Sequence, residues 1–153
     1  MPEQFTLRPS TSSDAGWIAE LRAEVMRPDL ERLGRFDSVR VRNRFLEAFQ
    51  PENTYVVRVQ GTDAGVIAVR PEKDEQWIEH FYVSPAHQGR GLGGAVLRRV
   101  MATFADSRPF RLNVLQGSPA RNLYERLGFR LESEDPVDVF MVAPGTAAQH
   151  PHQ

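Results

Sequence analysis

The chain has 153 residues, of which 41% are hydrophobic and 25% are charged, values typical of one globular domain with a single core. Its formal net charge of −1 gives no overall field that would hold nucleic acid or an anionic membrane, and no apolar run approaches the roughly 20 residues of a transmembrane helix. Cysteine is absent, which excludes disulfides, thiolate metal sites and covalent intermediates carried on cysteine. The N-terminus lacks the regions of a signal peptide. We therefore expect a cytoplasmic protein with no metal, no nucleic-acid partner and no membrane partner.

Hydrophobic periodicity predicts the order βααβββαβαββ, a single-domain α/β fold in which helices flank a mixed sheet. The first helix is expected to follow a capping box at Thr11 and Asp14 and to end before Pro28. The domain is expected to span residues 1–142, with a disordered tail at 143–153. In chain order the predicted elements are a strand at 4–8, helices ending near 26 and spanning 38–49, strands at 55–59, 66–69 and 75–83, a helix at 92–105, a strand at 110–115, a helix at 119–127, and strands at 129–132 and 137–142.

Glycines dominate the turn Gln88-Gly-Arg-Gly-Leu-Gly-Gly94, between a predicted strand and an amphipathic helix. Glycine can adopt unusual φ values and approach a ligand closely, so its amides can converge on phosphate oxygens. The following helix adds unpaired N–H groups and its positive dipole end. A connection that binds no ligand can have the same composition. The spacing differs from a Rossmann fingerprint, and the Gly-Lys-Ser or Gly-Lys-Thr of a phosphate-loop NTPase is missing.

Two segments together resemble the GNAT N-acetyltransferase superfamily. Phe81-Tyr-Val-Ser-Pro-Ala-His-Gln-Gly-Arg-Gly-Leu-Gly93 is similar to the family's acetyl-CoA motif, and Leu123-Tyr-Glu-Arg-Leu-Gly-Phe129 is similar to its second signature, a tyrosine on the last helix before a Gly-Phe turn. The resemblance extends over residues 4–142 and implies a mostly antiparallel sheet. It also implies an enzyme that transfers an acetyl group from acetyl-CoA, as co-substrate, to a primary amine of a small molecule or peptide.

The resemblance also implies where acetyl-CoA binds. Many relatives carry asparagine at the position of Ser118, so a helix-capping role for this serine is favoured over a coenzyme contact. The end of the strand before the turn is expected to supply backbone donors for the oxyanion and a gap for the pantetheine arm. The expected coenzyme-binding residues are Phe81, Tyr82, Val83, Gln88, Gly89, Arg90, Gly91, Leu92, Gly93, Gly94 and Ser118.

Two side chains are expected to carry the acid–base chemistry. Tyr124 is the candidate acid, because a phenol with a pKa near 10 is protonated at neutral pH and can donate to a departing thiolate. Its position on an apolar stripe also fits a packing role. Glu79 is the candidate base, flanked on one strand face by Trp77 and Phe81, which would raise its pKa by desolvation. His80 should point the other way unless the strand is bulged, and water is a further alternative.

The resemblance also implies that the two N-terminal helices and the loop between them shape the acceptor pocket. Their excess of arginine fits an acidic acceptor, or simply a solvated face with pairs such as Glu31–Arg35. The arginines are Arg27, Arg32, Arg35, Arg40, Arg42 and Arg44. Without cysteine, transfer should be direct, in a ternary complex. A coenzyme-A-binding regulatory module and a longer acyl-CoA donor are the alternatives, and the chain is expected to be a monomer or a homodimer.

Overall fold

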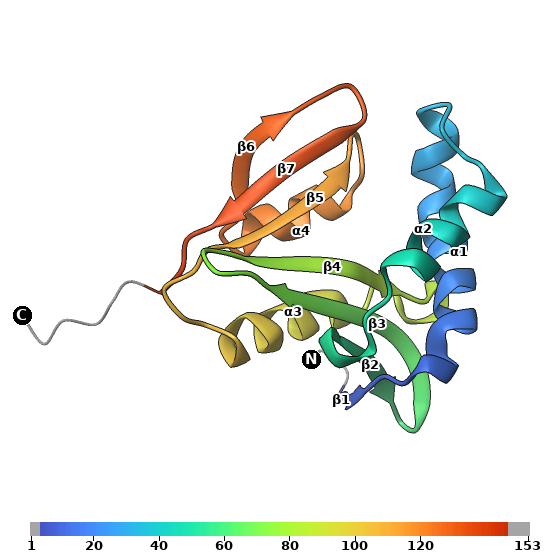
Figure 1. The fold of residues 1–153 in the computed structure, drawn as a ribbon, viewed down its shortest axis with the longest axis horizontal. Helices are drawn as coiled ribbons and strands as arrows, with labels where there is room; N and C mark the ends of the chain where they lie inside the picture. Colours follow the sequence, from blue (N-terminus) through green and yellow to red (C-terminus); the bar gives the residue numbers. More distant parts are fainter. Residues whose placement is uncertain (1–3, 147–153) are drawn as a thin grey trace, which may run out of the picture.

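The computed structural model describes residues 4–146 and confirms the predicted order of strands and helices. Seven strands form one sheet in the order β1-β2-β3-β4-β5-β7-β6 (Figure 1). No helix in this part of the chain is long and apolar enough to cross a bilayer. The elements are β1 (Thr6–Pro9), α1 (Ala15–Arg32), α2 (Ser38–Ala48), β2 (Thr54–Val59), β3 (Thr62–Pro71), β4 (Gln76–Val83), α3 (Leu92–Thr103), β5 (Phe110–Leu115), α4 (Ala120–Arg126), β6 (Arg130–Glu134) and β7 (Asp138–Ala143).

Every neighbouring pair of strands is antiparallel except β4 and β5, which are parallel. The β4–β5 ladder contains only two residue pairs, Gln76 with Phe110 and Trp77 with Arg111. From Ile78 onward the two strands diverge, and Figure 1 shows β4 running toward α2 while β5 runs away with β7 and β6. The sheet therefore has two halves that meet at the N-terminal ends of β4 and β5.

The two faces of the sheet are covered by different helices. One apolar cluster packs α3 and α4 against the sheet and includes Leu97, Val100 and Tyr124. A smaller cluster packs α1 and α2 against β3 and β4, centred on Ile18 and Phe45, both fully buried. Because α1 and α2 cover β3 and β4 rather than β5, the gap between β4 and β5 keeps an open side.

The predicted end of the first helix before Pro28 is wrong, because α1 continues to Arg32. A proline in a helix removes one N–H donor, which costs little where water can satisfy the acceptor, and Pro28 is exposed. Two ion pairs hold the last turn together, Arg27 with Glu31 at 2.9 Å and Arg32 with Asp29 at 2.6 Å. The backbone N–H of Leu33 closes the helix on the Asp29 carbonyl.

A bulge interrupts β4 in the middle of the strand. Val66 of β3 pairs with Tyr82 and Ala68 pairs with Glu79, so two residues of β4 stand opposite one residue of β3. The extra residue is His80, whose φ of 49° lies in the left-handed region that non-glycine residues rarely adopt. Beyond the bulge, Phe81 packs in the cluster on the α3 and α4 face. It therefore does not flank Glu79 as the regular alternation predicted.

The last strand, β7, ends at Ala143, one residue beyond the boundary predicted at residue 142. Ala143 is the last residue of β7 and is buried, and the backbone N–H of Thr146 donates to the Asp106 carbonyl at 2.7 Å. Residues 143–146 of the expected tail thus have defined contacts. The remainder of that tail, 147–153, lies outside the described residues.

Two glycine-to-alanine substitutions should change stability in opposite directions. A Cβ at Gly65 would lie 2.6 Å from the Tyr82 carbonyl oxygen, a backbone atom of the paired strand, so Gly65→Ala should lower the free energy of unfolding by about 1–3 kcal/mol. A Cβ at Gly16 in α1 would meet no atom within 4 Å, so Gly16→Ala should raise it by about 0.5–1 kcal/mol. Urea unfolding of both variants measures the difference. Equal shifts would contradict the close approach of β3 to β4.

Candidate active site

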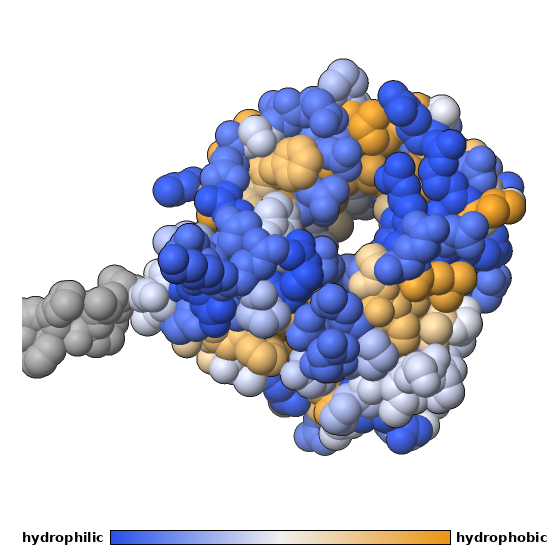
Figure 2. Space-filling view, viewed as in Figure 1, coloured by the Kyte–Doolittle hydropathy of each residue, from blue (hydrophilic) through white to orange (hydrophobic). Residues whose placement is uncertain are grey.

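A cleft of about 700 Å³ occupies the gap between β4 and β5. Residues 78–82 of β4 and 112–115 of β5 form its floor, α1 and α2 form one wall, and the loop before β7 together with the start of α4 forms the other. Figure 2 shows it as an opening in the middle of this face, with hydrophilic residues along most of its rim. The early end of the β4–β5 ladder creates this space, because two fully paired strands would leave no gap.

Tyr124 enters the cleft from α4 and is 8% exposed. Its ring packs edge-on against Phe129, with ring centroids 5.9 Å apart. Within residues 4–146 its hydroxyl has no hydrogen-bond partner, so the phenol is held by packing and its polar atom is left for a ligand. Burial raises the pKa of Tyr124 above its ordinary value, which keeps the phenol protonated.

Glu79 also lines the cleft but is held by an arginine rather than enclosed by aromatic rings. The Arg70 guanidinium donates to it through Nε at 3.0 Å and Nη2 at 3.3 Å, and Arg70 also pairs with Glu72. The hydrogen bond to Glu79 is the main cause of a raised pKa of Arg70. The side chain of Glu79 is 32% exposed, so the expected apolar enclosure between Trp77 and Phe81 is not present.

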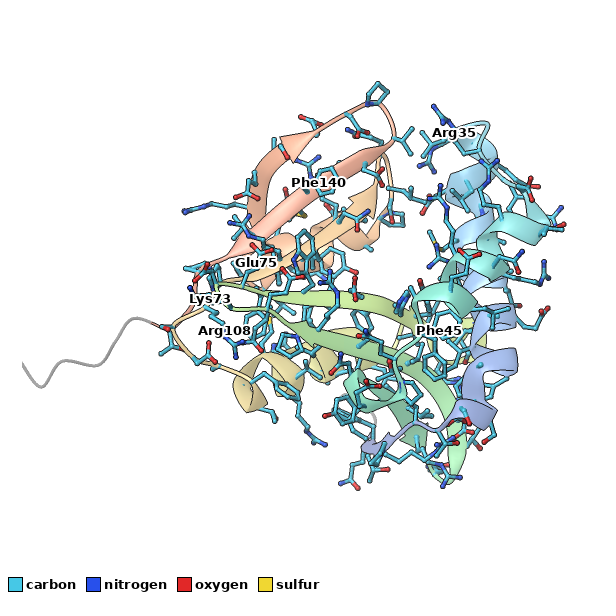
Figure 3. The ribbon with its side chains drawn as sticks, in the orientation of Figure 1. Arg35, Phe45, Lys73, Glu75, Arg108 and Phe140 are labelled. Carbon is cyan, nitrogen blue, oxygen red and sulfur yellow. The ribbon has the colours of Figure 1, made fainter. Side chains whose placement is uncertain are left out.

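The bulge turns His80 into the cleft, contrary to the expectation for a regular strand. Its ring meets the edge of Phe45, labelled on α2 in Figure 3, at a centroid distance of 5.0 Å. Burial lowers the pKa of His80 to about 4, with the Glu79 charge opposing and the Arg22 and Arg70 charges adding to that shift. The imidazole is therefore neutral at physiological pH.

The aromatic residues at the end of β4 point to opposite faces. The buried ring of Tyr82 packs with α1 and α2, and its hydroxyl accepts a hydrogen bond from Arg22 Nη1 at 3.0 Å. Burial raises the pKa of Tyr82. Phe81 and Val83 pack on the α3 and α4 face. All three were expected to bind the coenzyme. The Tyr82 hydroxyl is already hydrogen-bonded to Arg22, whereas the Tyr82 backbone lies in the part of β4 that no longer pairs with β5.

The glycine turn is separated from β4 by a short 3-10 helix at Pro85–His87 and leads into α3. Gly89 and Gly91 have φ values of 79° and 78°, which explains why glycine is needed at both positions. No side chain caps α3, so the N–H groups of its first turn point away from the helix without a side-chain partner in the described chain. Gln88 Nε2 ties the turn to the Val83 carbonyl at 2.8 Å. This is the geometry of an anion site at a helix N-terminus.

The next two glycines of the turn serve close packing. A Cβ at Gly93 would contact Leu123 at 3.6 Å and Phe81 at 3.8 Å, and one at Gly94 would contact Leu123 at 3.4 Å. The first turn of α3, where Leu92 is buried, therefore lies against both α4 and β4. The glycine motif and the signature that carries Tyr124 therefore approach each other closely at Leu123.

Ser118 lies at the start of α4 and lines the cleft. Its Oγ accepts a hydrogen bond from the Ala120 backbone N–H at 3.2 Å, which is the predicted helix-capping contact. Asn113, on β5, also lines the cleft and donates to Asp138 at 3.0 Å. In residues 4–146 no group of three metal-ligating side chains is present.

The six arginines expected around the acceptor divide into two sets. Arg27, Arg32 and Arg42 form ion pairs and do not line the cleft, and Glu31 pairs with Arg27 rather than with Arg35 as expected. The other three line the cleft, with Arg35 at the end nearest the loop between β6 and β7 (Figure 3). The cleft-lining set is Arg35, Arg40 and Arg44.

Sequence reasoning missed Arg22, which lines the cleft from α1. It lies one helical turn after the fully buried Ile18 and one turn before Met26, so a charged residue interrupts the apolar stripe. That interruption was the available signal. Asp135 and Asp138, on the loop before β7 and at its start, were also missed, and nothing local marks them as residues of the cleft.

Comparison with known proteins places this geometry in a family. A model of the acetyltransferase (GNAT) domain matches residues 50–131. Comparison with curated proteins found no match. The fold is similar to that of the ribosomal-protein-S18-alanine N-acetyltransferase from Escherichia coli, at 17% identity and a TM-score of 0.73, covering 98% of this chain and 99% of that one.

Two further solved structures have the same fold. A PaiA N-acetyltransferase from Thermoplasma acidophilum, in complex with coenzyme A, is 17% identical with a TM-score of 0.71, over 92% of this chain and 99% of that one. An acetyltransferase from Thermus thermophilus is 20% identical with a TM-score of 0.72, over 94% and 99%. The domain match covers more than half of the chain, from β2 through the glycine turn to α4. This chain belongs to the GNAT acetyltransferase family.

Proposed function

We propose that this enzyme is an N-acetyltransferase that moves the acetyl group of acetyl-CoA directly to a primary amine in a ternary complex. The observation that carries the proposal is the cleft between the diverging strands, into which a buried tyrosine hydroxyl with no protein partner in residues 4–146 projects. A phenol held in this way is placed to meet a reacting atom. The absence of cysteine favours direct transfer over an acyl-cysteine intermediate.

The glycine turn is proposed to bind the pyrophosphate of the coenzyme. The backbone amides of residues 89–94 and the positive end of the α3 dipole attract an anion, and Arg90 adds a charge that suits phosphate. The pantetheine arm would then follow the edge of β4 from which β5 has diverged, where backbone groups of Phe81 and Val83 can bind it. Ser118 borders the same gap.

Tyr124 is proposed as the general acid. The amine nitrogen attacks the thioester carbonyl carbon, the C–N bond forms, and the C–S bond breaks with its electron pair remaining on sulfur. The thiolate then takes a proton from the Tyr124 hydroxyl, and the nitrogen, which carries a surplus proton after the attack, releases one proton, which restores the phenol. Because burial raises the pKa of Tyr124 while a thiol has a pKa of about 8.5, complete proton transfer is uphill, and we expect a modest contribution from this step.

Glu79 is proposed as the group that attracts the substrate ammonium and accepts its proton. It is the carboxylate at the β4 side of the cleft, and its partner Arg70 holds it in position. His80 is the alternative base on the same strand. The His80 ring is neutral at physiological pH, so unlike the Glu79 carboxylate it carries no charge that would attract an ammonium group, which favours Glu79.

The function is tested by thiol release from acetyl-CoA with a panel of primary amines. Tyr124→Phe keeps the ring and removes the hydroxyl, so it should lower kcat by roughly 10–100-fold with the KM for acetyl-CoA little altered. Tyr55→Phe, on β2 outside the cleft, is the matched control and should retain the wild-type rate. Coenzyme binding without thiol release by any amine would overturn the proposed activity. A wild-type rate in Tyr124→Phe, with chemistry rate-limiting, would overturn the assignment of the acid.

The pH dependence of stability tests whether His80 can be the base. With a pKa of about 4 when folded and near 6.5 when unfolded, His80 makes the unfolded chain bind more protons between these values. The contribution of the neutral His80 ring to the free energy of unfolding is fully present above about pH 6.5. It decreases as the pH falls, by roughly 2 kcal/mol between pH 7.5 and 5. His80→Asn, which tolerates the left-handed backbone, should remove this decrease in urea unfolding. Identical pH dependence in both proteins would show that His80 titrates normally and would make it the stronger candidate base.

A further inference from the structure

Three arginines on the helical wall of the cleft form no ion pair with a described residue, although the Arg40 backbone N–H and, to a smaller extent, the Arg40 charge lower the pKa of the Asp37 carboxylate. Arg22 of α1 and Arg40 and Arg44 of α2 all line the cleft, and none forms an ion pair within residues 4–146. Arg22 donates only to the Tyr82 hydroxyl, and its Nε is buried without a partner. The guanidinium groups of Arg40 and Arg44 donate no hydrogen bond to any described residue. This wall therefore carries cationic donors that the protein itself does not use.

The acidic residues of the same cleft all accept hydrogen bonds from the protein. Asp29 and Glu79 are each paired with an arginine that is not one of the three, whereas Asp37, Asp135 and Asp138 accept hydrogen bonds only from neutral N–H groups and keep their negative charge. The pairs are Asp29 with Arg32, Asp37 with the backbone N–H groups of Val39 and Arg40, Glu79 with Arg70, Asp135 with the backbone N–H groups of Val137 and Asp138, and Asp138 with Asn113.

Arg40 and Arg44 lie next to each other on an exposed part of α2. They are one helical turn apart on α2, and like charges at this spacing repel each other. Their neighbours on that face, Val41 and Phe45, are buried, which holds the face toward the sheet. Arginine presents a planar fork of donors that fits a carboxylate with two parallel hydrogen bonds. An anion bound between these side chains would relieve the repulsion and use the donors.

The charge of the whole lining limits which anion fits. Four arginines, with Arg35 opposite Asp135, face the five carboxylates named above. A dianion would be repelled by these carboxylates, whereas a molecule with one positive and one negative group matches both sides. Beside the effect of burial, the Glu79 charge raises the pKa of His80 and the Arg22 charge lowers it. Both charged groups therefore lie near the His80 ring.

We propose that the acetyl acceptor is a zwitterion, a primary amine that carries a carboxylate on the same molecule. Arg22, Arg40 and Arg44 bind the carboxylate, and the ammonium faces Glu79 on β4. This inference rests on the proposed function, because it names the substrate class of the same cleft. It assigns the donors of the α1 and α2 wall to substrate selection, while the acid–base chemistry remains on β4 and α4.

Matched acids and amides test the proposal. Glycine, β-alanine and 4-aminobutyrate are each compared with their carboxamides in thiol release from acetyl-CoA, and phosphoethanolamine supplies a dianionic anchor. At least one acid should exceed its amide in kcat/KM by about tenfold or more. The double variant Arg40→Gln/Arg44→Gln should lose that preference through the KM of the acid. Arg42→Gln removes one positive charge from the same helix, outside the cleft, and should retain the preference.

The possible failures can be told apart. Turnover of acids and amides at equal rates, or a preference for phosphoethanolamine, would overturn the zwitterion and leave the acetyltransferase activity intact. Titration of the same amines into the coenzyme A complex measures binding without turnover. Selective binding of an acid with no thiol release would support the substrate class and overturn the proposed activity. Binding of neither member of any pair would overturn the inference.

Discussion

Gln76 joins the start of β4 to the segment before β5 at the closed end of the cleft, and the rest of the site depends on this junction. Gln76 is 1% exposed, its side-chain amide donates to the Phe104 carbonyl at 2.7 Å, and its backbone N–H donates to the Pro109 carbonyl at 2.9 Å. A buried amide is costly to leave unpaired, so these bonds fix the start of β4 to the segment before β5. The strands are therefore joined at one end and free to diverge at the other.

The bulge at His80 determines which side chains face the resulting gap. An extra residue in β4 reverses the alternation beyond it, so Phe81 packs toward α3 while Glu79 stays with Arg70 on the other face. A left-handed conformation at a residue other than glycine costs on the order of 1–3 kcal/mol, and here the packing of His80 against Phe45 supports it. The strain lies where the substrates are proposed to meet.

Features coded by neighbouring residues could be predicted from the sequence. The order of strands and helices, the glycine turn and the capping contact of Ser118 follow from periodicity, φ requirements and spacing. The continuation of α1 past Pro28 could not, because ion pairs in the following turn sustain the helix. The bulge is a property of strand pairing, and the role of Arg22 exists only because α1 crosses β4. Both depend on contacts between distant segments.

Amide hydrogen exchange with and without acetyl-CoA tests the central claim most directly. If the coenzyme lies in the gap between β4 and β5 with its pyrophosphate on the glycine turn, exchange should slow at residues 78–83 and 89–95. The amides of β6, which pair with β7 at the far edge of the sheet, should change little. Coenzyme binding that leaves exchange at residues 78–83 and 89–95 unaltered, or that protects other segments instead, would contradict the account.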